Sequence, residues 1–230
     1  MSGFAGFDIS GYPGDDMMAW LNANTNLVWC GFYLGPAPSH GDVGWMATRS
    51  TLQQGGWGLA PIYVGQQLSG AHSSHVVTEA QGGIDGGDAG GLMANAGFPA
   101  GSCVYLDLED GPPLNSPRSD YVAAWIDAVA AGSFRPGVYC SHAIAAAVQA
   151  LRADVRIWAF NVPTTQQTDF AGTQFPDADP SGSGFADAVA WQCRQECRLN
   201  LPGAPVTQPV VDLSSATTPD PGAPSVGAAV

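Results

Sequence analysis

Short apolar runs alternate with more polar segments along most of this chain. Each run is rich in Val, Ile, Tyr, Phe or Trp and is short enough to form a strand. Most are apolar almost throughout, which is typical of parallel strands buried on both faces. The eight runs that we interpret as strands are Gly3–Ile9, Leu27–Leu34, Gly58–Val64, Cys103–Leu108, Gly137–Cys140, Val155–Phe160, Ala188–Gln192 and Pro209–Leu213.

The segments between these runs predict helices. The clearest lies over Ser119–Ala131, where apolar side chains recur three and four residues apart. Another begins at Ser141, a residue type that commonly caps the first turn. In all, we expect helices over Asp15–Asn24, Asp42–Gln54, Gly87–Ala96, Ser119–Ala131 and Ser141–Leu151.

Strand–helix alternation repeated eight times predicts an α/β fold, a single (β/α)8 TIM-type barrel over residues 1–215. An open doubly wound sheet is the structural alternative, but such sheets usually carry a glycine-rich phosphate loop and none fits here. The stretch 161–187 is long and polar, so we expect an irregular or missing helix there. Residues 216–230 are rich in Pro, Ala and Gly and predict a flexible tail.

Three of the predicted strands close on acidic residues held between apolar neighbours, a place that acids avoid unless something requires them. Asp8 closes the first run, Asp107 and Glu109 the fourth, and Asp212 the eighth. Residues two apart in a strand face the same side, so Asp107 and Glu109 point together. The first and eighth strands are neighbours in a closed barrel. We therefore predict four carboxylates around one mouth of the barrel.

Crowded carboxylates raise one another's pKa and keep one acid protonated near neutral pH. A protonated acid beside an ionised one is what glycosidic bond cleavage requires. An isolated Asp at a strand end is more often a helix cap or turn residue, so the combination of four carries the prediction. A cation site is the alternative, but no carbonyl-rich calcium loop accompanies these acids. We expect no metal and no cofactor.

Polar and aromatic residues in the predicted strands are candidates for substrate binding, because sugars stack on aromatic faces and Gln can bind a hydroxyl. For most of the aromatic residues, a place in the barrel core is the alternative and the commoner role. The candidates are Tyr63, Tyr139, Trp158, Trp191 and Gln192.

The cysteines fall into two groups. Cys193 and Cys197 lie four residues apart in a polar stretch, and we expect them to be close enough to bridge. A zinc site that also used His72 and His75 is a less favoured alternative, because that histidine spacing is a weak metal-binding pattern. The remaining three lie in apolar runs and are expected to be buried and free; they are Cys30, Cys103 and Cys140.

Charge narrows the class of protein further. The 230 residues include 20 acidic and 7 basic ones, a formal net charge of −13, and every basic residue is arginine. Without lysine there is no P-loop lysine and no Schiff-base lysine. The acidic balance disfavours nucleic acid and anionic membrane surfaces as partners.

No apolar run reaches the roughly 20 residues that span a bilayer. No signal peptide is visible, so three explanations stay open: a cytoplasmic protein, an unconventional export route, or a sequence that has been trimmed.

Ten short motifs together resemble the glycoside-hydrolase-like family once catalogued as domain of unknown function 1906. They are Gly6–Asp8, Met18–Leu21, Gly31–Gly35, Pro61–Gln67, Gly97–Ser102, Tyr105–Glu109, Arg135–Ser141, Ile157–Asn161, Trp191–Gln192 and Val211–Asp212. Their order and spacing carry the resemblance, which covers nearly all of residues 4–215. That family is similar to the family 25 lysozymes, which are (β/α)8-barrel muramidases.

The resemblance implies a polysaccharide substrate, either peptidoglycan or a related amino sugar polymer. It implies that Glu109 is the general acid. Asp107 would orient or polarise the acetamido group of the substrate, or stabilise the oxocarbenium charge. Asp8 and Asp212 would tune this pair and hold the sugar. The main alternative is an inactive glycan-binding barrel that serves as a surface, virion or secretion-system component. A metabolic barrel enzyme is disfavoured, because both lysine and a phosphate-binding glycine motif are missing.

Overall fold

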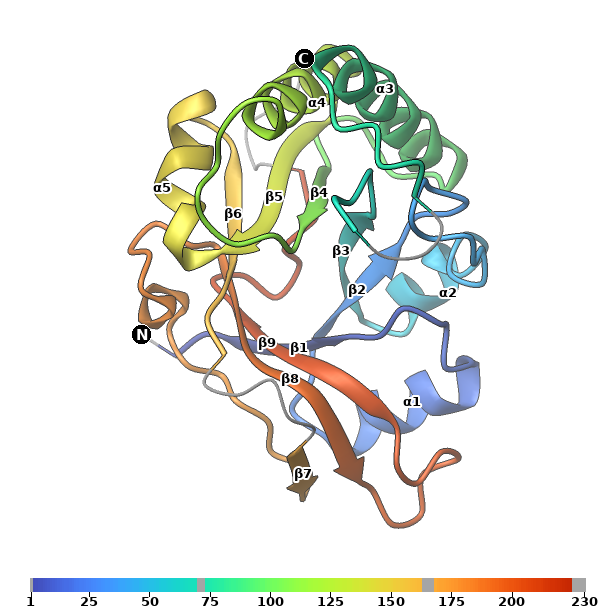
Figure 1. The fold of residues 1–230 in the computed structure, drawn as a ribbon. Helices are drawn as coiled ribbons and strands as arrows, with labels where there is room; N and C mark the ends of the chain where they lie inside the picture. The colour runs from blue at the N-terminus through green and yellow to red at the C-terminus, as the bar shows by residue number, and fades with distance from the viewer. Residues whose placement is uncertain (1, 70–72, 163–167, 225–230) are drawn as a thin grey trace.

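The computed structural model describes residues 2–69, 73–162 and 168–224. In this part of the chain, eight strands form a barrel with the neighbour order β6-β5-β4-β3-β2-β1-β9-β8, and pairing of β6 with β8 closes it (Figure 1). The predicted α/β barrel is therefore confirmed. The barrel strands are β1 (Phe4–Asp8), β2 (Trp29–Tyr33), β3 (Gly58–Tyr63), β4 (Cys103–Leu108), β5 (Arg135–Ser141), β6 (Arg156–Phe160), β8 (Ala190–Asn200) and β9 (Val210–Ala216).

The α-helices of the described residues follow the predicted positions with two differences in length. Ser141 caps the last of them, because its hydroxyl accepts the N–H of Ala143 at 3.3 Å. The second is shorter than predicted, since Asp42 accepts the N–H of Gly44 at 2.8 Å and forms a local turn instead. The helices are α1 (Asp15–Asn24), α2 (Arg49–Gln54), α3 (Glu79–Asn95), α4 (Arg118–Ala131) and α5 (His142–Leu151).

Helix α3 is longer than the helix that we expected over Gly87–Ala96. Each interior glycine costs a helix about 0.5–1 kcal/mol relative to alanine. Here the glycines allow α4 to lie very close alongside (Figure 1). A Cβ atom on Gly82 would lie 2.2 Å from the carbonyl oxygen of Tyr121, and one on Gly86 would lie 2.6 Å from that of Trp125. Packing against α4 thus outweighs the low helix propensity.

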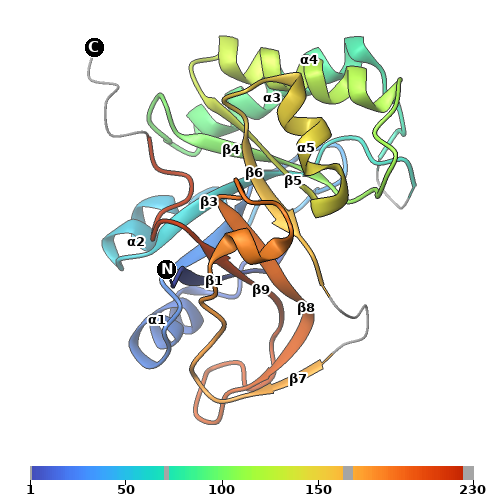
Figure 2. The ribbon, with the colours of Figure 1, turned by 90° about the vertical axis from the view of Figure 1, so that its left-hand side faces the viewer.

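The stretch 161–187 carries no α-helix in its described residues, as the fold prediction allowed. It holds the short strand β7 (Thr168–Ala171) and a 3-10 turn over Pro180–Ser183. Strand β7 pairs with Cys197–Asn200, the part of β8 that runs beyond the barrel. In both views this extension of β7, β8 and β9 lies away from α3 and α4 (Figures 1 and 2).

Strand β9 runs antiparallel to both of its neighbours, β1 and β8, whereas the alternation of strands and helices predicted eight parallel strands. A short connection without a helix joins β8 to β9, and such a connection reverses the chain direction. Asp212 therefore lies near the start of its strand and not at its end. Because the strand is reversed, this start lies beside the end of β1, and Asp8 pairs directly with Asp212.

Large aromatic side chains fill the barrel interior beneath this end. Trp29 and Trp158 meet edge to face with ring centroids 5.3 Å apart, and Tyr105 meets Trp158 at 5.7 Å. All three are buried, and the indole N–H of Trp29 donates to the carbonyl of Phe4 at 2.8 Å. The barrel is thus a packed core and not a pore. Among the described residues, no helix combines the length and the hydropathy needed to cross a bilayer.

Residues 217–224, which we expected to be flexible, pack against the opposite end of the barrel. The N–H of Leu59 donates to the Asp220 carboxylate at 3.0 Å, and the N–H of Cys103 donates to the carbonyl of Gly222 at 2.9 Å. The hydroxyl of Tyr105 donates to the carbonyl of Pro221 at 3.0 Å. The segment is ordered because it pairs main-chain groups at the starts of β3 and β4 that burial would otherwise leave unpaired. Residues 225–230 lie outside the described residues.

Asp220→Ala should lower the free energy of unfolding by about 1–2 kcal/mol, because the N–H of Leu59 would lose a carboxylate acceptor. Burial raises the pKa of Asp220, so the cost of burying this carboxyl group offsets part of the stability that its hydrogen bond contributes. Urea denaturation at pH 7 measures the change. The exposed Asp187 supplies the matched control: Asp187→Ala should change the stability by less than about 0.5 kcal/mol. Equal stability of both variants would mean that Asp220 does not anchor the segment.

Candidate active site

One pocket brings together the four acidic residues that the sequence singled out. Asp8 ends β1, Asp107 lies in β4, Glu109 follows β4 and Asp212 lies in β9. The pocket lies at the carboxyl ends of the parallel strands, the end at which barrel enzymes carry their active sites. The other side chains that line it are Tyr33, Ile62, Tyr139, Trp158 and Gln192.

The pocket is narrow. Its volume is about 30 Å³, which is room for about one water molecule. A wider hollow of about 200 Å³ adjoins it and shares Asp8, Tyr33 and Asp212 with it. The pocket itself therefore admits water, and a larger molecule could lie only at its rim and in the wider hollow.

Asp8 is the most deeply placed of the four acids, with 7% of its surface exposed. The hydroxyl of Tyr33 donates to Asp8 Oδ1 at 2.9 Å, while the buried Oδ2 has no hydrogen-bond partner among the described residues. Burial raises the pKa of Asp8 well above its usual range, the neighbouring carboxylates of Asp212, Asp107 and Glu109 add to this, and only the Tyr33 hydrogen bond opposes it. Asp8 therefore favours the protonated form.

Asp212 is the best hydrogen-bonded of the four. It accepts the N–H of Glu196 at 2.6 Å and the side-chain amide of Gln192 at 3.1 Å. Burial raises the pKa of Asp212 to about 6, the charges of Glu196 and Glu109 add to this, and the two hydrogen bonds oppose it. Asp212 thus changes its charge in the neutral to mildly acidic range.

A distortion of β8 supplies one of these hydrogen bonds. The β8–β9 pairing slips between Arg194 and Cys197, as in a β-bulge. Within this bulge Glu196 adopts a φ of 50°, in the left-handed region that costs a residue with a side chain roughly 1–2 kcal/mol. The same turn directs the N–H of Glu196 onto Asp212. Local backbone strain is therefore coupled to the placement of a pocket carboxylate.

Asp107 and Glu109 point to the same side of β4, because they are two residues apart. Asp107 is half-buried, and within the described part of the chain its Oδ1 has no hydrogen-bond partner, whereas Glu109 is exposed at the rim. Burial is the first cause that raises the pKa of Asp107, followed by Glu109, Asp212 and Asp110. Partial burial and the charge of Asp110 raise the pKa of Glu109. Glu109 is therefore the acid best placed to hold a proton within reach of solvent.

Three of the five residues predicted to bind substrate line the pocket, namely Tyr139, Trp158 and Gln192. Tyr63 does not, because its hydroxyl donates to Asp88 of α3 at 3.0 Å. Trp191 does not either, since its indole N–H donates to the carbonyl of Asn161 at 3.2 Å. Both differences follow from the alternation of side chains along a strand.

In each case, the neighbour in the same strand faces the pocket instead. The neighbour of Tyr63 is Ile62, and that of Trp191 is Gln192. Sequence reasoning missed Ile62 and Tyr33. Tyr33 was the easier of the two to predict, because it is a polar aromatic residue at the end of an apolar run. The candidate acids were identified from the same kind of position.

The expected bridge between Cys193 and Cys197 is absent, and all five cysteines are free and buried. Both lie in strand β8, which carries the chain from beside Leu213 to beside Val211 of β9 and so spaces the two cysteines along the strand. Cys193 donates instead to the carbonyl of Leu213, and the Cys197 sulfur lies 3.5 Å from the Thr168 hydroxyl.

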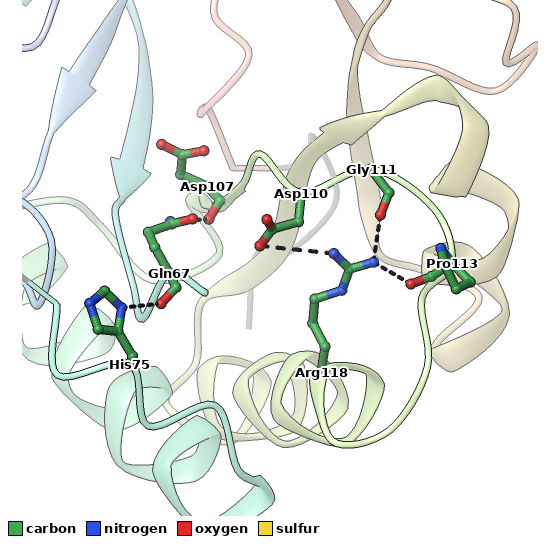
Figure 3. A network of polar contacts seen from close by, with 7 residues as sticks. All are labelled: Gln67, His75, Asp107, Asp110, Gly111, Pro113 and Arg118. Carbon is green, nitrogen blue, oxygen red and sulfur yellow. Dashed lines mark hydrogen bonds and ion pairs between the residues drawn. The ribbon is translucent and has the colours of Figure 1, made fainter. Parts of the chain in front are cut away.

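The zinc alternative finds no support in the described residues, where no three His, Cys, Asp or Glu side chains are placed to hold a metal ion. The ring of His75 contacts the carbonyl of Gln67 at 2.7 Å (Figure 3). His72, the other histidine of that alternative, lies outside the described residues.

Comparison with solved structures finds the same fold in bacterial proteins at low sequence identity. The Tat-secreted protein Rv2525c of Mycobacterium tuberculosis is 15% identical, with a TM-score of 0.64 over 96% of this chain and 98% of that one. A family 25 glycosyl hydrolase from Bacillus anthracis is 13% identical, with a TM-score of 0.56 over 94% and 90%. The autolysin LytC from Streptococcus pneumoniae, solved with a synthetic peptidoglycan ligand, is 13% identical, with a TM-score of 0.58 over 92% and 46%.

A search of curated proteins finds no match. A family description, by contrast, matches residues 19–198, which is most of the chain. This chain therefore belongs to the Rv2525c-like, glycoside hydrolase-like domain family.

Proposed function

We propose that this protein is a glycoside hydrolase that cleaves peptidoglycan or a related amino sugar glycan by carboxylate acid/base catalysis. The observation that carries the proposal is the pocket itself, where four carboxyl groups with raised pKa values line one mouth of the barrel. Of the residues that the structure describes, no Arg or His lines this pocket. Membership of a glycoside hydrolase-like family supports the reaction class, and the peptidoglycan ligand of LytC supports the substrate class.

Glu109 is the proposed general acid. In its protonated form it donates a proton to the glycosidic oxygen as the bond from this oxygen to the anomeric carbon breaks, so that the departing sugar leaves as an alcohol. Asp107, on the same side of the chain, stabilises the positive charge that develops at the anomeric carbon, directly or by orienting the acetamido group of the substrate. A water molecule then adds to the anomeric carbon, and its proton returns to Glu109.

Asp8 and Asp212 are proposed to hold the sugar and to tune the pKa values of Asp107 and Glu109. Their charges face Asp107, so each ionisation makes the next more costly and favours a proton within the cluster. Tyr139, which is partly exposed, offers aromatic surface beside the acids, whereas Trp158 lines the pocket as a buried side chain. The amide of Gln192 is already held by Asp212, so we assign it to positioning that carboxylate.

The direct test measures reducing ends released from purified peptidoglycan and from chitin-type oligomers between pH 4 and 8. Release is expected on at least one substrate, with activity falling as the pH rises past the raised pKa of Glu109, because the acid then loses its proton. A protein that binds none of these glycans and releases nothing would contradict the proposal.

The second candidate is an inactive glycan-binding barrel that acts as a surface, virion or secretion-system component. The observation that favours it is the small volume of the pocket, about 30 Å³, which holds no sugar ring. The same assay separates the two functions when it is paired with a glycan pull-down. Binding without the release of reducing ends on any substrate would favour the binding function.

A further inference from the structure

A buried arginine holds the chain segment that follows Glu109. Arg118 is the first residue of α4 and only 6% of its surface is exposed. Its guanidinium donates to the carbonyl of Gly111 at 2.8 Å and to that of Pro113 at 2.6 Å, and it lies 3.9 Å from the Asp110 carboxylate (Figure 3). A guanidinium donates from a rigid fork, so one side chain can hold two carbonyls of a loop in a set geometry.

The position of Glu109 depends on such contacts, because Glu109 lies one residue beyond β4. The last pair of the β4–β5 ladder joins Leu108 to Cys140. Just before Glu109, the side-chain amide of Gln67 donates to the carbonyl of Asp107 at 3.1 Å (Figure 3). The segment is thus held on one side by the sheet and Gln67, and on the other side by Arg118.

We propose that Arg118 is a positioning residue for Glu109: by fixing Gly111 and Pro113, it keeps the Glu109 carboxyl at the rim of the pocket. The proposal rests on the proposed function, in which this carboxyl is the general acid. A purely structural arginine would stabilise the loop and leave the environment of Glu109 unchanged, so the two roles differ in a measurable property of that carboxyl.

That property is its titration. Partial burial is the first cause that raises the pKa of Glu109, so a loosened segment that lets the carboxyl turn toward water should lower this pKa. The titratable and charged groups that surround it on the neighbouring elements are Asp110, Asp107, Asp8, Asp212, Tyr139 and, behind Asp110, Arg118.

The chain offers a clean probe, because its only glutamates are Glu79, Glu109 and Glu196. Protein labelled with carbon-13 at the glutamate carboxyl carbon gives three signals, and the signal that Glu109→Gln removes is that of Glu109. Carboxyl titrations by NMR would compare the wild type, Arg118→Gln and Arg118→Lys. Arg156→Gln is the matched control, since Arg156 also donates to a main-chain carbonyl, that of Pro221 at 3.3 Å, at the other end of the barrel.

The expected result is a raised Glu109 pKa in the wild type and in Arg156→Gln, a clearly lower one in Arg118→Gln and an intermediate one in Arg118→Lys. If Arg118→Gln fails to fold, Arg118→Lys carries the test, because lysine keeps the charge and loses the fork. An unchanged pKa of Glu109 in every folded Arg118 variant would overturn the proposal. So would an equal fall in Arg156→Gln.

Kinetics separates this proposal from the proposed function. In an active enzyme, Arg118→Gln should lower kcat about 10-fold to 100-fold with little change in KM, because a misplaced general acid affects the transition state and not substrate binding. Arg156→Gln should leave kcat unchanged. If the wild type cleaves no glycan while the Glu109 titration still depends on Arg118, the proposed function fails and the positioning of Glu109 stands. If the wild type cleaves glycan and Arg118→Gln is fully active, only the positioning role fails.

Discussion

A Glu109→Gln variant is expected to cleave glycan about 10²–10⁴-fold more slowly than the wild type, with its fold unchanged. Glutamine keeps the shape of the side chain and its hydrogen-bonding groups but has no proton to give to the leaving oxygen. Two features of the pocket make Glu109 the proposed acid: it is exposed at the rim, and partial burial together with the charge of Asp110 raises its pKa. Release of reducing ends from peptidoglycan and chitin-type oligomers measures the loss.

The matched control is Glu79→Gln, the same chemical change in the first turn of α3. It should retain full activity. Circular dichroism and the thermal midpoint of both variants should match the wild type, since Glu109 lies at the surface. A fully active Glu109→Gln variant would transfer the role of the acid to Asp107 or Asp110. An equal loss in both variants would point to an effect on the whole fold.

Asp212→Asn is expected to abolish or strongly reduce glycan cleavage and, at pH 7.5, to raise the stability of the protein by up to about 3 kcal/mol. Folding raises the pKa of Asp212 from 3.8 to about 6, and each pKa unit corresponds to about 1.4 kcal/mol. A carboxyl group whose pKa is raised by folding contributes its full stability at pH values below its pKa in the unfolded state. This stability is lost as the pH rises through about 6. Asparagine stays uncharged and avoids the loss.

Urea unfolding of this variant and of the wild type at pH 4 and pH 7.5 tests the prediction. The stability gain should be present at pH 7.5 and nearly absent at pH 4, where Asp212 of the wild type is protonated in the native state. Asp187→Asn, at an exposed position, should show no such difference between the two pH values. A gain of equal size at both pH values would mean that packing and not charge is responsible. A destabilised variant at pH 7.5 would show that the ionised carboxylate supports the fold.

Local pattern was sufficient for much of the fold. Short apolar runs and the three- and four-residue spacing between them located the barrel strands and several helices, and α1 has the predicted bounds. Side-chain burial imposes these patterns on neighbouring residues, so they are visible without a structure. The acids were visible for a related reason: a carboxylate between apolar residues at a strand end is costly unless a site uses it.

The local sequence pattern did not predict the direction of a strand. It also did not predict the face of the strand on which a given residue lies. An apolar run looks the same in either direction, yet β9 is reversed, and Asp212 meets Asp8 from the start of its strand. A shift of one residue moves a side chain to the other face of a strand. For this reason Ile62 and Gln192 line the pocket while Tyr63 and Trp191 do not.

Contacts between residues distant in the chain decided the rest. Asp220 meets Leu59 and turns a segment of flexible composition into an ordered one. Cys193 and Cys197 stay unbridged although they are close in the sequence, because the Cys193 thiol donates to the carbonyl of Leu213 and the Cys197 sulfur lies beside the Thr168 hydroxyl. The N–H of Glu196 reaches Asp212 only because the β8–β9 pairing is irregular at that point. The sequence by itself therefore determined which acidic residues are candidates for the chemistry and which segments are strands. Their mutual positions were decided by the tertiary structure, because strand pairing and packing depend on residues that no local window contains.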